Sequence, residues 1–82
     1  MEKTIHTTAY KNLIAWLKEC REKKGISMRD LADELGVSHS WIGKVEQMER
    51  RLDVCEYVHL CEALDVSPRT GIDKLKLELS KH

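Results

Sequence analysis

Apolar residues recur with a helical period along most of this chain, beginning near its N-terminus. In the first segment they stand at positions i, i+3, i+4 and i+7, as Leu13, Trp16, Leu17 and Cys20. This spacing places all four on one face of an α-helix, with charged residues on the other faces. Thr7 or Thr8 can cap the start of the helix, and Gly25 follows its last turn. The pattern predicts an amphipathic helix from about residue 8 to residue 24.

Residues 1–7 precede this helix and show no periodicity. We therefore expect a flexible N-terminal arm there, followed by a single domain over residues 8–82. Arms of this kind enter a DNA groove in some DNA-binding domains. Simple fraying of the chain end is the alternative interpretation, and the one that we favour.

The stretch from residue 27 to residue 46 predicts two short helices with a tight break between them. Ser27 can cap the first helix, and Asp30 stands three residues later, as in a capping box. Gly36 follows the first helix, where a left-handed C-terminal cap favours glycine. Ser38 can then cap the second helix. Two capped helices joined by a short turn with glycine have the sequence form of a helix-turn-helix.

The second of these helices, at about residues 38–47, turns Ile42 and Val45 inward. The residues left facing outward at its start are small or polar: His39, Ser40, Gly43 and Lys44. A surface of this kind suits close contact with the edges of DNA bases.

Two further helices are predicted after the helix-turn-helix. Asp53 and Glu56 have capping-box spacing and start a helix that reaches about Leu64. Its apolar residues at helical spacing are Val54, Val58, Cys61, Ala63 and Leu64, with Cys55, Tyr57 and Leu60 widening the face. Ser67 and Pro68 provide a cap and a first-turn proline for the last helix. Its predicted buried face consists of Ile72, Leu75 and Leu79, and Leu77 lies outside that face.

No segment alternates apolar and polar residues for long enough to indicate a strand. We therefore expect an all-α fold, a compact five-helix bundle that forms a single domain. The composition agrees, because 41% hydrophobic and 34% charged residues are ordinary for a soluble globular chain of 82 residues. No run approaches the roughly 18 apolar residues of a membrane span, and no apolar signal-peptide region is present. The prediction is a cytoplasmic protein without membrane contact.

The charge balance does not by itself favour DNA binding. Fourteen basic and fourteen acidic residues give a net charge of zero, whereas DNA-binding domains are often strongly basic. The charges are partly segregated, however. Residues 1–26 include six Lys or Arg and three acidic residues, whereas residues 52–82 include four Lys or Arg and six acidic residues. The N-terminal part is therefore basic and the C-terminal part is acidic.

Five segments in register resemble the phage-repressor-type helix-turn-helix family, the xenobiotic-response-element regulators. They are residues 17–27, 31–38, 42–46, 50–53 and 63–68. Any one of them is a weak signal, but their joint spacing is specific, and the resemblance covers about residues 8–75. It implies the five-helix fold of the phage-repressor DNA-binding domain.

The resemblance also implies roles for individual residues. Bases in the major groove are expected to be read by His39, Ser40, Trp41, Gly43 and Lys44. DNA phosphates are expected to contact Ser27, Met28, Arg29, Ser38, Gln47, Arg50 and Arg51. A structural salt bridge is expected between Arg21 and Glu46 and would fix the recognition helix.

The chain departs from the family pattern at two methionines. Met28 stands where many relatives carry glutamine, so a polar contact to DNA is lost there. Met48 stands where many relatives carry glycine. Because methionine lacks the freedom of glycine at positive φ, we expect the loop to follow a different path.

By this resemblance the protein is a sequence-specific DNA-binding transcriptional regulator, such as a phage repressor or the controller protein of a restriction-modification operon. It is expected to bind a pseudo-palindromic operator in double-stranded DNA as a homodimer. The candidate dimer surface consists of Ile72, Leu77 and Leu79. RNA polymerase is a candidate partner for the acidic patch Asp30, Asp33 and Glu34, although a solvated helix face explains the same residues.

A second function class remains open. The same fold serves as a protein-interaction module in antitoxin-like proteins, and the zero net charge and acidic C-terminal third fit that alternative. Dependence of DNA binding on salt concentration separates the two.

Neither catalysis nor a cofactor is expected. The chain has no glycine-rich phosphate loop and no nucleophile elbow. Cys55 and His59 have the i, i+4 spacing of a metal pair, with Cys61 nearby, but zinc sites generally need four ligands. Buried thiols beside a surface histidine are the interpretation that we favour, so no metal is expected. The three cysteines also imply no disulfide framework.

Overall fold

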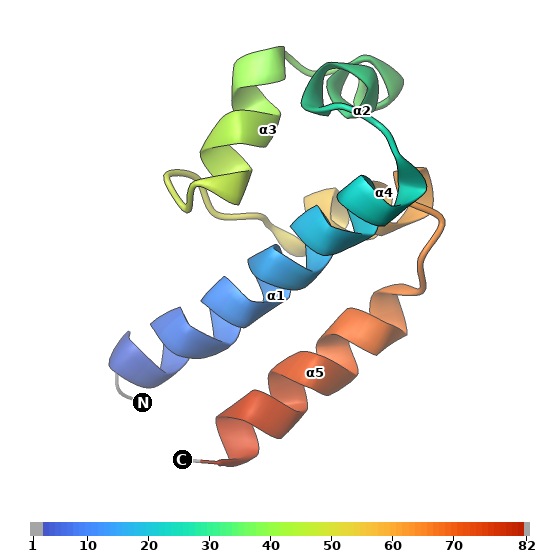
Figure 1. Cartoon of the computed structure of the whole chain (residues 1–82). Helices are drawn as coiled ribbons and strands as arrows, with labels where there is room; N and C mark the ends of the chain where they lie inside the picture. Colours follow the sequence, from blue (N-terminus) through green and yellow to red (C-terminus); the bar gives the residue numbers. More distant parts are fainter. Residues whose placement is uncertain (1–2, 82) are drawn as a thin grey trace.

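The computed structural model describes the backbone of residues 3–81 and the side chains of residues 8–81. Its elements are α1 (Lys3–Lys24), α2 (Met28–Leu35), α3 (His39–Glu46), α4 (Val54–Ala63) and α5 (Pro68–Ser80). No strand occurs among these residues. The prediction of an all-α, five-helix fold is therefore confirmed. The long helices α1 and α5 lie side by side, while α2 and α3 form a separate layer at the other end of the molecule (Figure 1).

One core joins the two layers. Its buried residues include Leu13 and Leu17 of α1, Leu31 of α2, Ile42 and Val45 of α3, and Tyr57, Leu60, Cys61 and Leu64 of α4. The apolar stripe predicted for the first helix thus faces this core. Trp16 and Cys20 lie half-buried at its edge.

The first helix begins at Lys3, five residues before the predicted cap at Thr8. The intervening residues include neither glycine nor proline, so no residue there breaks the backbone hydrogen bonds of the helix. Of the predicted arm, residues 3–7 are thus helical, and residues 1–2 lie outside the described residues.

Three predicted helix boundaries agree with the structure. Ser27 and Asp30 form a reciprocal capping box at the start of α2, and Asp53 and Glu56 form another at the start of α4. Gly36 ends α2 in the left-handed conformation, with φ of 71°. Each cap satisfies backbone groups that the helix itself leaves unpaired.

The predicted inward faces of the last two helices need correction. Val54 is 78% exposed and Ile72 is 42% exposed, although both were assigned to buried faces. Instead α4 turns Tyr57 inward and α5 turns Gly71 toward α1. The glycine carries no side chain, so α5 approaches α1 closely at this point and its apolar residues rotate toward the edge of the contact.

Tyr57 connects α4 to the start of α5. Its hydroxyl donates a hydrogen bond of 2.6 Å to the backbone carbonyl of Pro68. Burial raises the pKa of Tyr57 well above its ordinary value, so the hydroxyl keeps its proton as a donor.

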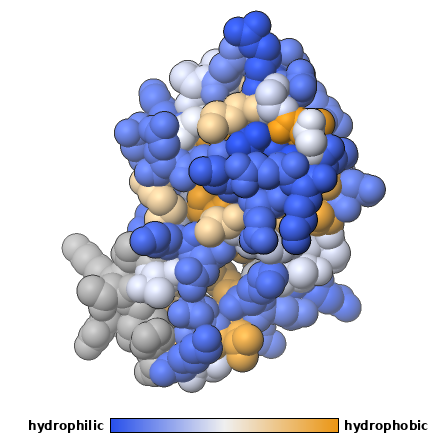
Figure 2. All heavy atoms as spheres, in the orientation of Figure 1, coloured by the Kyte–Doolittle hydropathy of each residue, from blue (hydrophilic) through white to orange (hydrophobic). Residues whose placement is uncertain are grey.

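The face of the molecule that Figure 2 shows is largely hydrophilic, with small apolar patches on it. Among the described residues, the exposed large apolar side chains are Val54, Ile72 and Leu77, the last of them 63% exposed. Within residues 3–81, none of the helices has the length and apolar character that crossing a membrane requires.

Candidate nucleic-acid interface

The exposed face of α3 carries most of the residues predicted to read bases. His39, Ser40 and Lys44 are exposed, and Gly43 is half-buried between them. Ile42 and Val45 on the opposite side are only 2% and 3% exposed and anchor the helix in the core. One short helix therefore combines a buried apolar side with a polar outer side.

A buried ion pair fixes the C-terminal end of α3. The guanidinium of Arg21 donates from Nε to Glu46 Oε2 at 2.7 Å and from Nη2 to Oε1 at 3.2 Å. Its Nη1 donates to the carbonyl of Ile26 at 2.9 Å. The two side chains are 10% and 8% exposed, and their hydrogen bonds raise the pKa of Arg21. This bidentate geometry links α3 to the end of α1.

The turn before α3 differs from the prediction in one detail. Ser38 occupies the cap position, but its side chain makes no capping hydrogen bond. Its hydroxyl instead lies 3.1 Å from the hydroxyl of Ser40. The turn is held by backbone bonds, including Val37 N–H to the carbonyl of Ala32 at 3.0 Å. Both serine hydroxyls remain on the exposed side of the turn.

His39 lies near an acidic residue of α2. Its Nε2 is 3.6 Å from Asp33 Oδ1, and the two side chains are 50% and 68% exposed. A pair this exposed contributes little to stability. The contact places an acidic side chain beside the imidazole at the start of α3.

Arg50 in the loop after α3 is already engaged within the protein. Its guanidinium lies 5.1 Å from the ring centroid of Trp41 and donates two hydrogen bonds, of 3.0 and 2.9 Å, to the carboxylate of Glu56. Trp41 itself is half-buried against the core. Arg50 therefore covers the indole and holds it in place. Its side chain is also 40% exposed, and its phosphate contact stays a prediction.

A second arginine–aromatic contact holds the same loop to α1. Arg51 lies 5.0 Å from the ring centroid of Tyr10, and the Tyr10 hydroxyl accepts a hydrogen bond of 3.0 Å from the backbone N–H of Leu52. Sequence reasoning did not identify Tyr10, because 42 positions separate it from its partner and no local pattern links them.

The remaining predicted phosphate contacts lie in different surroundings. Ser27, Arg29, Ser38 and Gln47 are exposed, and so is Arg51 beside its aromatic contact. Met28 is half-buried and packs against the core, so its side chain belongs to the edge of the fold. Within the described side chains, neither Arg29 nor Lys44 has an ion-pair partner, which leaves both cations available to a phosphate or a base.

Met48 adopts the left-handed backbone conformation that glycine favours. Its φ is 67°, in the left-handed region, so the expectation of a different backbone path is wrong. The Met48 side chain packs half-buried against the core. That burial offsets the cost of the unfavourable backbone conformation, on the order of 1 kcal/mol.

The contact between Arg50 and Glu56 makes stability depend on pH. Hydrogen bonds from Arg50 and from the Asp53 backbone hold the pKa of Glu56 below its ordinary value. Because the pKa of Glu56 is lower in the folded than in the unfolded protein, ionisation of Glu56 stabilises the fold at pH values above the pKa of the unfolded carboxyl. This stabilisation is lost as the pH falls through the pKa of the folded protein.

We therefore expect Glu56→Gln to lower the Tm at pH 7 and to leave a smaller acid-induced loss of Tm than in the wild type. Thermal unfolding followed by circular dichroism between pH 7 and pH 3 measures both. Glu19→Gln is the control, because its partner Lys23 lies 3.8 Å away on an exposed helix face. Parallel pH profiles of wild type and Glu56→Gln would contradict the assignment.

The cysteines and His59 do not form a metal site among the described residues. No group of three or more His, Cys, Asp or Glu side chains there is arranged to hold an ion. Cys61 is buried in the core and His59 is exposed, as predicted. Cys55 is exposed, so the prediction of a buried thiol is wrong there. Burial raises the pKa of Cys61 and of Cys20, which keeps both thiols protonated as small apolar groups.

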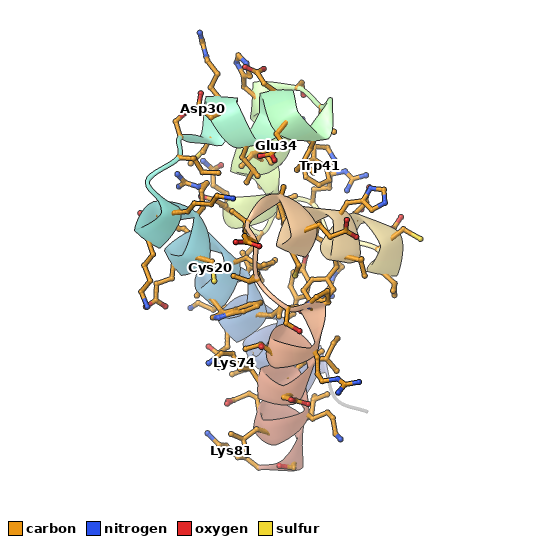
Figure 3. All side chains as sticks on the ribbon, turned by 90° about the vertical axis from the view of Figure 1, so that its right-hand side faces the viewer. Cys20, Asp30, Glu34, Trp41, Lys74 and Lys81 are labelled. Carbon is orange, nitrogen blue, oxygen red and sulfur yellow. The ribbon has the colours of Figure 1, made fainter. Side chains whose placement is uncertain are left out.

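The acidic residues of α2 do not gather at one end of the helix: Asp30 lies in its first turn, and Glu34 lies in its last turn on the side toward α4 (Figure 3). Asp30 belongs to the capping box and Asp33 approaches His39, so both have structural partners. Glu34 is exposed.

Comparisons with known proteins agree with this geometry. The family model described as Helix-turn-helix matches residues 17–70, more than half of the chain. Among solved structures, the chain is similar to an XRE-family like protein from Pseudomonas syringae pv. tomato str. DC3000. The sequences are 39% identical, the match covers 92% of each chain, and the TM-score is 0.87. No match is found among curated proteins.

Proposed function

We propose the following function on the premise that this chain belongs to the XRE-type helix-turn-helix family of DNA-binding regulators. It binds a specific operator in double-stranded DNA, with the exposed face of α3 in the major groove, and it does so as a two-fold dimer on a pseudo-palindromic site. It regulates transcription by occupancy, either blocking RNA polymerase or contacting it from an adjacent site through the acidic patch of α2.

The observation that carries this proposal is the way α3 is held. Ile42 and Val45 anchor one side in the core, and the buried pair of Arg21 and Glu46 fixes its end. A helix that is rigid on its inner side presents His39, Ser40 and Lys44 with little further loss of freedom on binding. Base-specific hydrogen bonds from such a helix are the usual mode of major-groove recognition.

Phosphate contacts in this proposal come from Ser27, Arg29, Ser38, Gln47 and Arg51, which flank α3 and are exposed. Trp41 contributes as a fixed support at the edge of the reading face. Two protomers then contact about ten phosphates, enough to make binding strongly dependent on salt.

Selection of bound duplexes from a random pool, at roughly 50 and 200 mM salt, tests this function directly. We expect one enriched sequence with two-fold symmetry. With about ten phosphate contacts, we also expect an affinity that falls by about 10⁵-fold between the two conditions. Recovery of no enriched sequence would overturn the proposal.

The dimer surface that we propose lies on α5. Leu77 is 63% exposed and lines a groove between α1 and α5 beside Trp16 and Lys74. Leu79 is half-buried and Ile72 is 42% exposed, and these two lie seven residues apart on another face of α5, so the proposed surface extends around the helix from Leu77. This surface lies at the end of the molecule away from α2 and Trp41 (Figure 3).

Replacement Leu77→Lys is expected to weaken dimerisation at least tenfold, because a charge replaces an apolar contact at the interface. Sedimentation equilibrium measures the change. Val54→Lys is the matched control, since Val54 is also an exposed aliphatic residue but lies on α4. A Leu77→Lys protein that remained dimeric would remove Leu77 from the interface.

A protein-interaction module of the antitoxin type is the second candidate. It is favoured by the zero net charge and by the engagement of Arg50 with Glu56, both of which limit attraction to phosphates. Weak DNA binding that does not change with salt would favour this candidate over operator binding.

A further inference from the structure

Gly43 is in the middle of α3, on the exposed side of the helix between Ser40 and Lys44. Glycine inside a helix lowers stability relative to alanine, because its backbone loses more freedom on folding. The fold does not require glycine here. Its φ is not positive, and an added Cβ would meet no atom within 4 Å. The fold therefore gives no reason for a glycine at this position.

The missing side chain leaves a notch in the exposed face of α3. The polar backbone groups at its floor are already paired, since the Gly43 carbonyl accepts from the N–H of Gln47 at 2.9 Å and the Gly43 N–H belongs to the helix ladder. The floor thus offers no free donor or acceptor. Polar side chains at Ser40 and Lys44 border it.

We propose that this notch receives the 5-methyl group of a thymine in the operator. The inference rests on the proposed function, because it places the exposed face of α3 in the major groove. The thymine methyl is the apolar group that base pairs present there. It matches an apolar notch of methyl size, and neighbouring Ser40 and Lys44 remain free to hydrogen-bond adjacent base edges.

A methyl group on residue 43 and the methyl group of that thymine occupy the same space. Gly43→Ala therefore weakens binding to the thymine-containing site, and replacing that thymine by uracil removes the conflict. The two changes compensate each other, which distinguishes a seated methyl group from a general effect of the substitution.

The test uses the duplex enriched by selection, with each thymine replaced by uracil in turn, and fluorescence anisotropy as the readout. For the wild type, replacing one particular thymine by uracil weakens binding about fourfold. This factor corresponds to about 0.8 kcal/mol, the free energy of burying one methyl-sized group. Gly43→Ala binds the thymine duplex about tenfold more weakly. It binds the matching uracil duplex within about threefold of the wild type on thymine.

Two controls exclude an effect through folding. Gly43→Ala is expected to raise the Tm by roughly 4 °C, because alanine is the better helix former. His59→Ala makes a similar gain in helix propensity at an exposed position of α4, and its affinity for both duplexes stays unchanged.

Three results would overturn the inference while leaving operator binding intact. They are an enriched site without thymine, undiminished binding of Gly43→Ala to the thymine duplex, and the absence of a uracil position that restores its binding. Failure of the wild type to enrich any sequence overturns the proposed function itself, and the inference with it.

Discussion

Replacement of Glu46 by glutamine is expected to lower the free energy of unfolding by about 3 kcal/mol. The substitution leaves the Arg21 guanidinium, 10% exposed, without its charged partner. A neutral amide offers one acceptor oxygen where the carboxylate offers two, and its NH2 group places a donor against the Arg21 guanidinium. The uncompensated charge is costly because little water reaches it, and the loss corresponds to a Tm decrease of at least about 12 °C.

Urea unfolding at constant pH measures this difference, and Glu19→Gln provides the control. The Glu19 side chain is 63% exposed and lies 3.8 Å from Lys23, so its loss should cost less than about 0.5 kcal/mol. The double variant Arg21→Met with Glu46→Leu should recover much of the stability, since it leaves no charge unpaired. Melting of Glu46→Gln within a degree of the wild type would show that the pair contributes nothing.

Gly71→Ala is expected to lower the free energy of unfolding by a similar amount, about 3 kcal/mol. An added Cβ overlaps the Tyr57 hydroxyl and comes within 2.6 Å of Cζ3 of Trp16 and 3.0 Å of Cδ1 of Leu13. To make room, Tyr57 must move away from the Pro68 carbonyl, to which it donates at 2.6 Å. The clash and the lost hydrogen bond exceed the gain in helix propensity, about 1 kcal/mol.

The same substitution at the other helical glycine is the matched comparison. Gly43→Ala adds a methyl group to open space and should stabilise the fold, so the two alanine variants should shift the unfolding midpoint in opposite directions. Urea unfolding of both proteins measures the contrast. Stabilisation by Gly71→Ala would mean that α5 is free to move away from α1.

The sequence predicts those parts of the fold that depend on local chemistry. The caps formed by Ser27 with Asp30 and by Asp53 with Glu56 involve residues three positions apart, so they can be recognised without tertiary information. The direction of α5 cannot. Gly71 is buried and faces Leu13 and Trp16 of α1, which a hydrophobic pattern does not register, so the prediction of Ile72 as a buried residue is wrong.

In the candidate site, too, local sequence patterns predict individual residues but not their tertiary contacts. Arg50 was recognised as a cation next to the recognition helix, and Glu56 as a capping residue. Their mutual hydrogen bonds, and the position of Arg50 over Trp41, arise only when α4 packs beneath the loop. Tertiary pairing thus gives Arg50 a structural role, the support of Trp41 beside α3, that the sequence pattern does not reveal.

The positions of the two tryptophans give each end of the molecule its own optical reporter. Trp41 lies under the Arg50 guanidinium beside the recognition helix, and Trp16 lies where α1 meets α5. Indole emission responds to its immediate surroundings. Fluorescence from single-tryptophan proteins therefore separates events beside α3 from events along α5, without an external label.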